Sequence, residues 1–351
     1  MSVKFDHPIW VLFSSGTTGK PKAITHGTGG MLLEQYKSHS LHHNIMNGDR
    51  FFWNTTTGWM MWNYAIGSFL CGATLCLYDG SANFPDIGVQ WRFAKDAKIN
   101  HFGNGSPMFI ASMKQNCKDV SNENLKFIKT IGATGSPLSV EAFKWLQKKL
   151  PSTQIISLSG GTDVCSAFIG GCPKLPVYAG FLQCNMLGAS IKAWDENRKS
   201  IKGKTGELVI TEPLPSMPVF FWGDENFKKY NDSYFAEDQE VWTHGDWIFI
   251  DELRGVLMQG RSDATLNRNG IRIGTSEIYS VLDGIKEIKD SLIIDLNIDG
   301  SSKLILFVET DNELNKDFKS NIIKEIKSRC SPRHSPNLIF PISQVPYTIS
   351  G

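Results

Sequence analysis

The order of apolar and polar residues predicts a chain that mixes strands and helices. A β-prone apolar run from Ile9 to Phe13 leads into a Ser/Thr/Gly-rich loop, and residues 23–25 can resume a strand after it. The segment from Phe51 to Trp62 carries three tryptophans around the polar stretch TTTG, a pattern too irregular for a helix face and too aromatic for a solvated loop. Because it lies between two predicted strands, the loop after Phe13 is expected to be a strand-to-strand turn.

A helix is predicted over residues 138–150. Ser139 stands where an N-cap is expected, and Pro151 follows the last turn. Four apolar residues fall on one stripe of this helix: Val140, Phe143, Leu146 and Leu150. We expect that stripe to face the core.

A buried strand is predicted over residues 154–158, which read QIISL. The chain leaves this strand through Gly160 and Gly161 and reaches Thr162 and Asp163. Ligands bind outside the carboxyl ends of the strands in α/β sheets. Thr162 and Asp163 are therefore candidate site residues.

The last third of the chain turns β-rich and ends in a smaller unit. GELVIT begins at Gly206, and DWIFID and GVLMQG follow with a short polar turn between them, which predicts a hairpin. The stretch GRSDATLNRNG has the composition of a linker, so the domain boundary is placed at Asp263, giving domains 1–262 and 263–351. Helices near 276–282 and 313–328 and strands at 292–296 and 304–309 predict a small α+β unit.

Length and charge favour a globular protein in which any anionic ligand is bound by local groups rather than attracted by the net charge. The chain has 351 residues, of which 41% are hydrophobic and 20% charged, with a formal net charge of +1. This length predicts one large domain and a smaller one. The balanced charge gives no attraction to nucleic acid or to an anionic membrane, and no apolar run reaches the ~18 residues that a membrane span needs. We expect neither partner.

The N-terminus and the cysteines indicate a cytosolic protein. MSVKFDHPIW has neither a basic n-region nor an apolar h-region. The seven cysteines form no CxxC pair, so neither a disulfide framework nor a zinc knuckle is predicted. His42 and His43 have no third spaced ligand, and they are interpreted as a surface pair rather than a metal site.

The stretch SSGTTGKPK, residues 14–22, consists of groups that can hold phosphate. Glycines let backbone N–H groups turn toward an anion, four hydroxyls can donate, and two lysines supply positive charge. A Walker A loop reads GxxxxGK[ST], whereas here Gly16 and Gly19 are three apart and Pro21 follows Lys20, which argues against an ordinary P-loop NTPase. On composition alone, a solvated turn that binds nothing is an equal alternative.

Residues 14–24, which read SSGTTGKPKAI, resemble the phosphate loop of the acyl-adenylate-forming enzymes. Four further segments match that family in its order: GATGSPLS (132–139), SGGTD (159–163), THGD (243–246) and GRSDATLNRNGIRI (260–273). The resemblance covers essentially all of the chain. It implies a large α/β adenylation domain, here partial, followed by a small mobile α+β domain. FDHPIWVLFSSGTTGKPKAI, TTTGWMMW and SGGTDVCSAF look most like the branch of the family that makes acetoacetyl-CoA.

The resemblance implies a nucleotide site. Asp246 would accept both ribose hydroxyls, and Arg261 would add a ribose or phosphate contact. Lys22 would be a peripheral phosphate contact. The run that would wrap the ATP phosphates comprises Ser14, Ser15, Gly16, Thr17, Thr18, Gly19 and Lys20, and the turn that would line the adenine comprises Gly135, Ser136 and Pro137.

Thr162 and Asp163 stand where the family has Thr-Glu. The resemblance implies that the Thr162 hydroxyl faces the α-phosphate and that Asp163 helps to hold Mg²⁺, an oxygen-seeking ion. Aspartate is one methylene shorter than the family's glutamate, so a water-bridged contact with the metal is expected rather than direct coordination. Together with Lys20, these two residues are the candidate catalytic groups.

An acyl pocket is implied beside Trp59. In related enzymes that accept acetate, a tryptophan closes the pocket at the position that Gly160 holds here. Loss of the indole would open space for a four-carbon keto acid, and Trp59 with Met60 or Met61 would form another wall. The alternative is that Gly160, like Gly161, permits a tight turn.

The implied reaction joins a carboxylic acid to a thiol. Acetoacetate attacks the α-phosphorus of Mg-ATP to give an acyl adenylate and pyrophosphate, and the thiol of coenzyme A then displaces AMP. In the family the small domain rotates about the hinge residue, here Asp263, and presents the face that carries Gly270 and Arg272 for thioester formation. Acetoacetate, ATP and coenzyme A are the expected small-molecule partners.

Both ends of the chain look cut by comparison with the family. The family's adenylation lysine lies in a motif like PxTxSGK, and this chain ends PYTISG, so the lysine would be the next residue. The phosphate loop begins at residue 14, whereas the family has a large part of its main domain before it. We therefore expect a fragment that is deficient in adenylation and prone to associate through exposed apolar surface. Two alternatives stay open: another short-chain acyl-CoA synthetase, and a nucleotide-binding remnant without catalysis.

Overall fold

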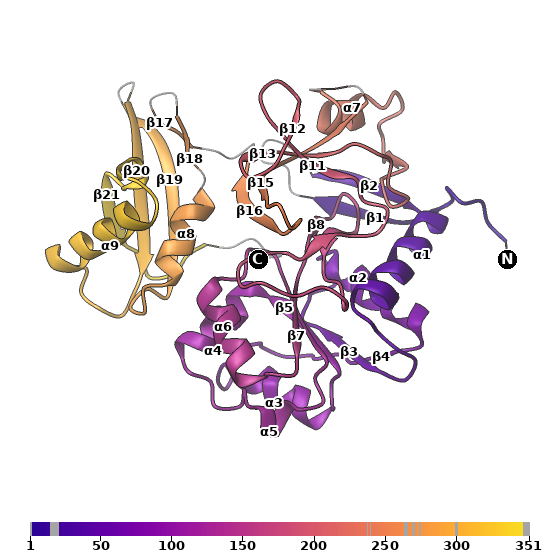
Figure 1. Ribbon diagram of the computed structural model, residues 1–351, viewed down its shortest axis with the longest axis horizontal. Helices are drawn as coiled ribbons and strands as arrows, with labels where there is room; N and C mark the ends of the chain where they lie inside the picture. The colour runs from indigo at the N-terminus through magenta and orange to yellow at the C-terminus, as the bar shows by residue number, and fades with distance from the viewer. Residues whose placement is uncertain are drawn as a thin grey trace. The chain divides into compact units, whose positions relative to one another are not determined.

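The chain forms two compact units in the computed structural model (Figure 1). The structure describes residues 2–14, 21–236, 238, 240–262, 266–268, 271–273, 275–298 and 301–346. The first unit comprises Met1–His244 and Phe249–Leu257, and the second comprises Gly245–Ile248 and Met258–Gly351. The predicted boundary residue, Asp263, lies outside the described residues, so its role as the boundary stays a prediction.

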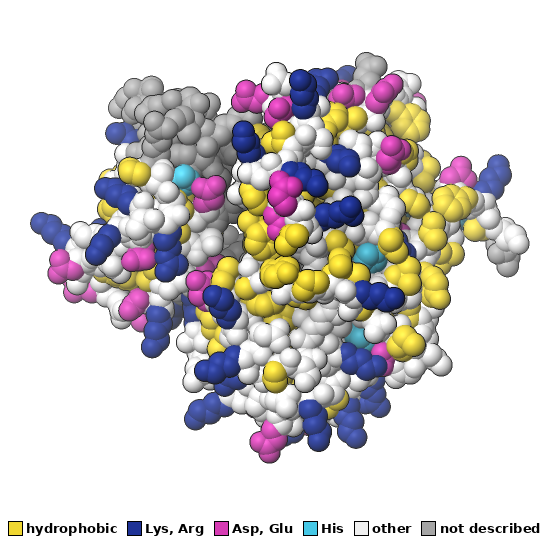
Figure 2. All heavy atoms as spheres, viewed as in Figure 1, with side chains coloured by type: hydrophobic (Ala, Val, Ile, Leu, Met, Phe, Trp, Pro, Cys, Tyr) yellow, Lys and Arg dark blue, Asp and Glu magenta, His cyan; other side chains and the backbone are white. Residues whose placement is uncertain are grey.

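The surface carries charges of both signs. Figure 2 shows Lys and Arg side chains interspersed with Asp and Glu over the visible face, in keeping with the formal net charge of +1. Among the helices that the structure describes, none has the length and apolar character that crossing a membrane would need.

The centre of the first unit is a five-stranded parallel sheet with the strand order β4-β3-β5-β6-β7. Its strands are β3 (Arg50–Trp53), β4 (Thr74–Leu75), β5 (His101–Gly105), β6 (Thr130–Thr134) and β7 (Gln154–Ser157). The helices in its crossovers are α2 (Met61–Gly67), η2 (Ser68–Cys71), α3 (Val89–Asp96), α4 (Ser106–Lys114), α5 (Asn122–Leu125) and α6 (Val140–Lys149). Because all five strands are parallel, their carboxyl ends meet at one edge.

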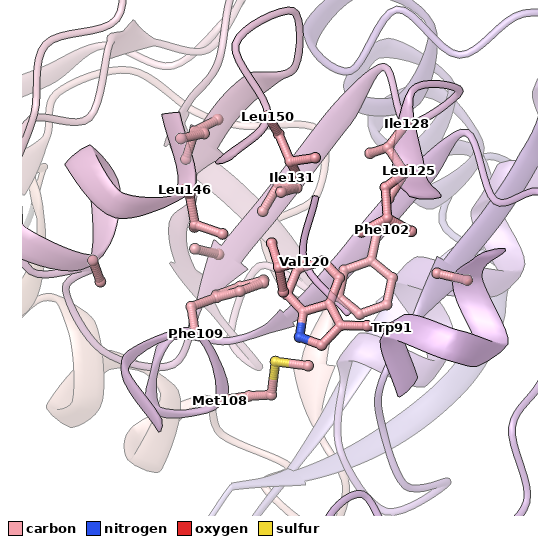
Figure 3. Packing of buried hydrophobic residues seen from close by; sticks show 14 of the residues in the cluster. Trp91, Phe102, Met108, Phe109, Val120, Leu125, Ile128, Ile131, Leu146 and Leu150 are labelled. Atoms are coloured by element: carbon pink, nitrogen blue, oxygen red, sulfur yellow. The ribbon is translucent and has the colours of Figure 1, made fainter. Parts of the chain in front are cut away.

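Both faces of this sheet are buried, as a parallel sheet requires. Successive side chains of β3 alternate between two clusters: Phe51 and Trp53 lie in one, and Phe52 lies in the other. In the second cluster the Trp91 ring of α3 stacks on Phe102 of β5, with ring centroids 4.5 Å apart (Figure 3). The sheet therefore forms a layer between two apolar cores.

Two glycines let the Trp53 indole lie against the sheet. A Cβ atom at Gly103 of β5 would come within 2.0 Å of the Trp53 ring, and one at Gly132 of β6 would come within 2.5 Å. Real Cβ contacts are longer than this, so any other residue at these positions would displace the indole. Packing thus explains the first residue of the segment GATGSP.

The helix predicted over residues 138–150 is α6. Its cap is confirmed, because the Ser139 hydroxyl accepts a hydrogen bond from the backbone N–H of Ala142 at 3.2 Å. Phe143 and Leu146 are buried as predicted. The prediction for Val140 is wrong: this side chain is 38% exposed, and the first turn buries Ala142 instead.

The predicted strand-to-strand turn is confirmed on both of its sides. Strand β1 (Pro8–Ser14) pairs antiparallel with β2 (Lys22–Gly27), and Ser14 lies opposite Lys22. The short strand β14 (Phe220–Phe221) continues this sheet beside β2. The loop residues 15–20 lie outside the described residues.

The predicted irregular segment 51–62 is only partly irregular. Its first residues belong to β3, and Met61 begins α2. Phe51, Trp53, Met60 and Met61 are buried in one cluster, and Trp59 packs against it, which explains two of the three tryptophans in a stretch with a polar centre. The non-helical, non-strand part is limited to residues 54–60.

Two further sheets complete the first unit and lead into the second. One has the order β10-β9-β8, with β8 (Ser159–Gly161), β9 (Ser166–Gly170) and β10 (Cys184–Asn185). The other has the order β12-β11-β13-β15-β16, with β11 (Ile191–Trp194), β12 (Ser200–Ile201), β13 (Thr205–Ile210), β15 (Trp242–Ile250) and β16 (Val256–Arg261). The predicted strand in GELVIT and the predicted neighbours β15 and β16 are confirmed. The remaining helices are α1 (Thr28–Lys37), η1 (Ser38–His42) and α7 (Lys228–Tyr234).

The second unit has the predicted α+β composition. Strand β19 (Asp290–Ile298) pairs antiparallel with β20 (Ser301–Glu309), and β21 (Leu338–Pro341) pairs parallel with β20. Helices α8 (Thr275–Asp283) and α9 (Lys316–Arg329) contribute Ile278, Leu282, Ile322 and Ile326 to its core. The other elements are β17 (Leu266–Arg268), β18 (Ile271–Ile273) and η3 (Pro332–His334).

The interpretation of His42 and His43 as a surface pair is wrong. Both side chains are buried, at 4% and 1% exposure. The His42 Nδ1 donates to the Gly171 carbonyl at 2.7 Å, and its Nε2 accepts from the Leu187 N–H at 3.0 Å, which fixes a neutral tautomer. Among the described residues, no group of three or more His, Cys, Asp or Glu side chains is arranged to hold a metal ion.

Candidate active site

The predicted site segments of the first unit meet at the carboxyl edge of the parallel sheet. Residues 54–60 follow β3, the turn 135–137 follows β6, and β7 leads through residue 158 to Thr162 and Asp163. The register pairs Gly105 with Thr134 and Ala133 with Ser157, so β5, β6 and β7 end side by side. This is the edge where α/β sheets bind ligands.

The turn after β6 is held from both sides. Gly135 has a φ of +85°, a backbone conformation that favours glycine. The Ser106 hydroxyl at the start of α4 donates to the Ser136 carbonyl at 2.6 Å, and the Thr134 hydroxyl donates to the Leu158 carbonyl at 3.0 Å. Ser136 is exposed, as is Pro137 after it, so the turn offers a fixed backbone surface to solvent.

Asp163 collects contacts from three separate parts of the chain. Lys22 at the start of β2 donates to its Oδ1 at 2.8 Å, and the Tyr234 hydroxyl at the end of α7 donates to the same oxygen. The His26 Nε2 donates to the Asp163 backbone carbonyl at 2.9 Å. The strand that leaves the phosphate loop is thereby tied to the carboxyl edge of the sheet.

The electrostatics of this group keep the carboxylate charged and the phenol neutral. Burial alone would raise the pKa of Asp163, but the Lys22 ammonium, His244 and the hydrogen bonds from Lys22 and Tyr234 outweigh it and hold the pKa below its usual range. Burial and the negative charge of Asp163 raise the pKa of Tyr234 far above its usual value. Both effects keep the phenol protonated, as a hydrogen-bond donor to Asp163.

The phosphate loop is described only at its ends. The Ser14 hydroxyl is buried and has no hydrogen-bond partner among the described residues. Lys22, predicted as a peripheral phosphate contact, forms an ion pair with Asp163 at 2.8 Å, and its phosphate role stays a prediction. The six predicted phosphate ligands Ser15, Gly16, Thr17, Thr18, Gly19 and Lys20 lie outside the described residues.

Asp246 and Arg261 belong to the second unit, where they are close to each other. The Arg261 guanidinium lies 3.7 Å from Asp246 Oδ2, and the Asp246 side chain is largely buried. The backbone N–H of Ser262, the residue after β16, donates to the carbonyl of Gly245 within β15 at 2.8 Å. The two residues predicted to contact the ribose are thus adjacent although 15 positions separate them in the sequence.

Of the predicted hinge and coenzyme A residues, the structure describes Arg272. Asp263 and Gly270 lie outside the described residues, and their roles stay predictions. Arg272 is in β18, where its backbone lies opposite Asn267 of β17. A two-stranded hairpin therefore carries this part of the predicted thioester-forming face.

The surroundings of Gly160 argue against the acyl pocket, and they place the residue in strand β8 rather than in a tight turn. A Cβ atom at Gly160 would lie 2.0 Å from the Ser166 carbonyl oxygen and 2.5 Å from the Ala167 Cα, both on the paired strand β9. The missing side chain thus points at backbone rather than at open space. Trp59, Met60 and Met61 pack in the cluster beside β3, so a wall at this place remains compatible with the structure.

Three residues of the site were not found in the sequence. His26, Ser106 and Tyr234 belong to none of the segments on which the resemblance rests. Tyr234 lies in KKYNDSYF, where no periodicity or glycine marks a site. Its contact with Asp163 joins residues 71 positions apart, and no local pattern records such a contact.

Comparison with protein families matches residues 2–218 to a family described as AMP-binding enzyme. The chain belongs to this family. The chain is 40% identical over 352 residues to acetoacetyl-CoA synthetase from Gallus gallus. This match covers 99% of the chain and 53% of the relative. It is also 40% identical over 350 residues to acetoacetyl-coenzyme A synthetase from Rhizobium meliloti (strain 1021), covering 99% and 54%.

A solved structure agrees with these relatives. Acetoacetyl-CoA synthetase from Streptomyces lividans superposes with a TM-score of 0.91 at 41% identity, covering 99% of this chain and 54% of that chain. The predicted resemblance to the adenylate-forming family and the predicted fold are confirmed. This AMP-binding family member spans about half the length of the curated relatives that it matches.

Proposed function

We propose that this chain carries part of an acid–thiol ligase that activates acetoacetate with ATP and transfers the acyl group to coenzyme A. The observation that carries the proposal is the grouping of Asp163, Lys22 and the turn 135–137 at the carboxyl edge of one sheet. Relatives named acetoacetyl-CoA synthetase, 40% identical along 99% of this chain, support the choice of acid.

The nucleotide would be held by backbone and hydroxyl donors at its phosphates and by a carboxylate at its ribose. Ser14 supports this role, because its buried hydroxyl has no partner among the described residues and stands at the start of the phosphate loop. The rigid exposed turn at Gly135 suits a flat ring lying against backbone. Asp246 would accept the two ribose hydroxyls, since the two oxygens of a carboxylate match a vicinal diol.

Asp163 fits a Mg²⁺ ion that arrives with the nucleotide. Both of its hydrogen bonds fall on Oδ1, and no described residue donates to Oδ2. Mg²⁺ usually takes one or two protein carboxylates together with substrate phosphates and waters, so one available carboxylate oxygen meets its requirement. The ion, when bound, would neutralise phosphate charge.

The side chains of the chain would supply position and charge rather than covalent chemistry. The Thr162 hydroxyl would donate to the α-phosphate, and Lys20 would balance charge on the departing pyrophosphate. Alignment of the acid's carboxylate with the α-phosphorus would account for most of the rate. Thioester formation would follow after rotation about Asp263, with Gly270 and Arg272 on the face that receives coenzyme A.

Calorimetric titration with ATP and with AMP tests the nucleotide site. We expect the chain to bind both, and Asp246→Ala to bind about tenfold more weakly because the ribose loses two hydrogen bonds to a charged group. Asp232→Ala, which removes an exposed carboxylate paired with Lys228, is the control and should bind as the unaltered chain does. No binding at millimolar nucleotide would overturn the proposal.

A second candidate is nucleotide binding without ligation. Pyrophosphate exchange in the presence of acetoacetate, acetate or a longer acid separates the two. Exchange that depends on acetoacetate supports the ligase, exchange with another acid points to a different acyl-CoA synthetase, and ATP binding without exchange supports the second candidate.

A further inference from the structure

The contacts around Asp163 give Tyr234 a specific place in the site. Its hydroxyl and the Lys22 ammonium donate to the same carboxylate oxygen, Oδ1. The terminal torsion of an aspartate is soft, so a carboxylate held by one mobile donor can present either oxygen. Two donors that converge on one oxygen determine which oxygen faces away from them.

The two donors differ in how firmly they are held. Tyr234 is 3% exposed, and its ring stacks on the fully buried ring of Trp242 at 3.6 Å between centroids and 13° between planes. The Phe221 ring packs against it in a T-shaped arrangement, with ring centroids 5.6 Å apart. The phenol therefore has no room to swing away from Asp163.

Lys22 is the mobile partner. Its side chain is 29% exposed, it sits on a four-carbon stem, and its ammonium lies 4.8 Å from the centroid of the Tyr234 ring. It follows the phosphate loop by two residues, so an anion in that loop competes with Asp163 for its charge. When Lys22 turns toward the phosphates, Tyr234 alone keeps Oδ1 occupied.

We propose that Tyr234 is a positioning residue that holds Oδ1 of Asp163, so that Oδ2 faces the cation carried by the nucleotide. The inference rests on the proposed function, because it assigns Asp163 to the Mg²⁺-nucleotide complex. Tyr234 does not touch the substrate. It acts through Asp163 and sets the dependence of nucleotide binding on Mg²⁺.

The test compares ATP affinity in Mg²⁺ and in EDTA by calorimetry, with Tyr234→Phe as the variant. We expect ATP affinity in EDTA to stay within about twofold and the Mg²⁺-dependent gain to fall about tenfold, the effect of one hydrogen bond to a charged acceptor. Tyr230→Phe is the matched control. Tyr230 belongs to the same aromatic cluster, with its ring 5.2 Å from that of Tyr234, and its hydroxyl has no hydrogen-bond partner among the described residues.

A rescue variant separates positioning from a loss of fold. 4-Aminophenylalanine at position 234 places an N–H donor where the hydroxyl was, and we expect it to restore most of the Mg²⁺-dependent gain. If Tyr234→Phe fails to fold, this variant carries the test alone. If the 4-aminophenylalanine variant keeps the Mg²⁺-dependent gain, the proposal is supported. If this variant folds but loses the gain, the proposal is overturned.

The outcomes distinguish this inference from the proposed function. If Asp163→Asn loses the Mg²⁺-dependent gain while Tyr234→Phe keeps it in full, the positioning role is overturned and the proposed nucleotide site stands. If the unaltered chain binds ATP equally in Mg²⁺ and EDTA, the role of Asp163 fails and the inference fails with it. A drop in affinity of the same size in both buffers would mark Tyr234 as merely structural and would also overturn the proposal.

Discussion

Lys22 and Asp163 are 141 positions apart in the sequence, and the Lys22 ammonium lies 2.8 Å from Asp163 Oδ1. The pair is partly buried, and it joins the strand after the phosphate loop to the segment that follows β7. It therefore connects two segments of the first unit that are far apart in the sequence.

Removal of the Lys22 charge is expected to destabilise the first unit. Lys22→Met leaves a partly buried carboxylate with one side-chain donor, and we expect a loss of about 1–3 kcal/mol in the free energy of unfolding, measured by urea denaturation. Lys228→Met removes an ammonium from an exposed pair with Asp232 and should leave the transition unchanged. Equal transitions for both variants would mean that the pair does not stabilise the unit.

Substitution of Gly160 separates close packing of β8 against β9 from the acyl pocket. Gly160→Ala places a Cβ atom 2.0 Å from the Ser166 carbonyl oxygen, and we expect a loss of about 1–3 kcal/mol in stability as the strands shift apart. At Gly161 the nearest atom to a Cβ is 3.7 Å away, so Gly161→Ala is the matched control. Thermal denaturation measures the stability of both variants. A stable Gly160→Ala protein with altered acid preference would favour the pocket instead.

Buried histidines are expected to make the first unit sensitive to acid. Burial lowers the pKa of His39 to about 4 and also lowers the pKa values of four others: His26, His42, His43 and His101. Because the folded state holds these rings neutral, the unfolded chain binds more protons below about pH 6.5. Stability is complete above that pH and falls as the pH drops toward 4. His39 alone contributes about 3 kcal/mol to this loss.

The histidine prediction is checked by urea denaturation at several pH values between 4.5 and 7.5. His39→Gln should show a shallower fall of stability with decreasing pH than the unaltered chain. His7→Gln, which changes an exposed histidine, should show the same fall as the unaltered chain. An unaltered slope in His39→Gln would contradict the assignment.

The outward face of α1 is expected to drive self-association. Leu32, Leu33 and Tyr36 are about half exposed, whereas the polar residues Glu34 and Gln35 are buried. Figure 2 shows hydrophobic side chains gathered where α1 lies, at the right of the view. Contiguous exposed apolar surface of this kind favours contact with a second copy.

Charge placed on this helix tests the association. Leu33→Lys with Tyr36→Lys should lower the apparent mass in size-exclusion chromatography with light scattering at high protein concentration. Leu253→Lys changes an exposed leucine in the turn between β15 and β16 and is the control. If the helix variant and the unaltered chain show the same mass at every concentration, α1 does not mediate association.

Residues close together in the sequence determined the elements of the fold. Ser139 caps α6 through a contact with Ala142, three positions away, and the β1–β2 pairing places Ser14 opposite Lys22 across one short loop. Such contacts depend on neighbours, so local patterns predict them. The position of Thr162 and Asp163 beyond a strand's carboxyl end was predictable for the same reason.

The predictions that were wrong concern contacts between segments that are far apart in the sequence. Val140 follows the apolar stripe of its helix, yet Ala142 takes the buried position in the first turn. His42 is buried because its ring bonds to Gly171, 129 positions away. The contact that excludes a side chain at Gly160 comes from the backbone of a paired strand rather than from any residue type.

The sequence by itself determined the elements, the order of the motifs and the family, because these depend on residue types at short spacings. Only the tertiary structure decided the partners of Asp163, the burial of the histidines and the packing of Gly160. Each of these is a contact between segments that the chain brings together on folding, and its geometry depends on how the whole sheet packs. Tyr234 is the clearest case: no local pattern marks it, and the fold places its hydroxyl on the carboxylate of Asp163.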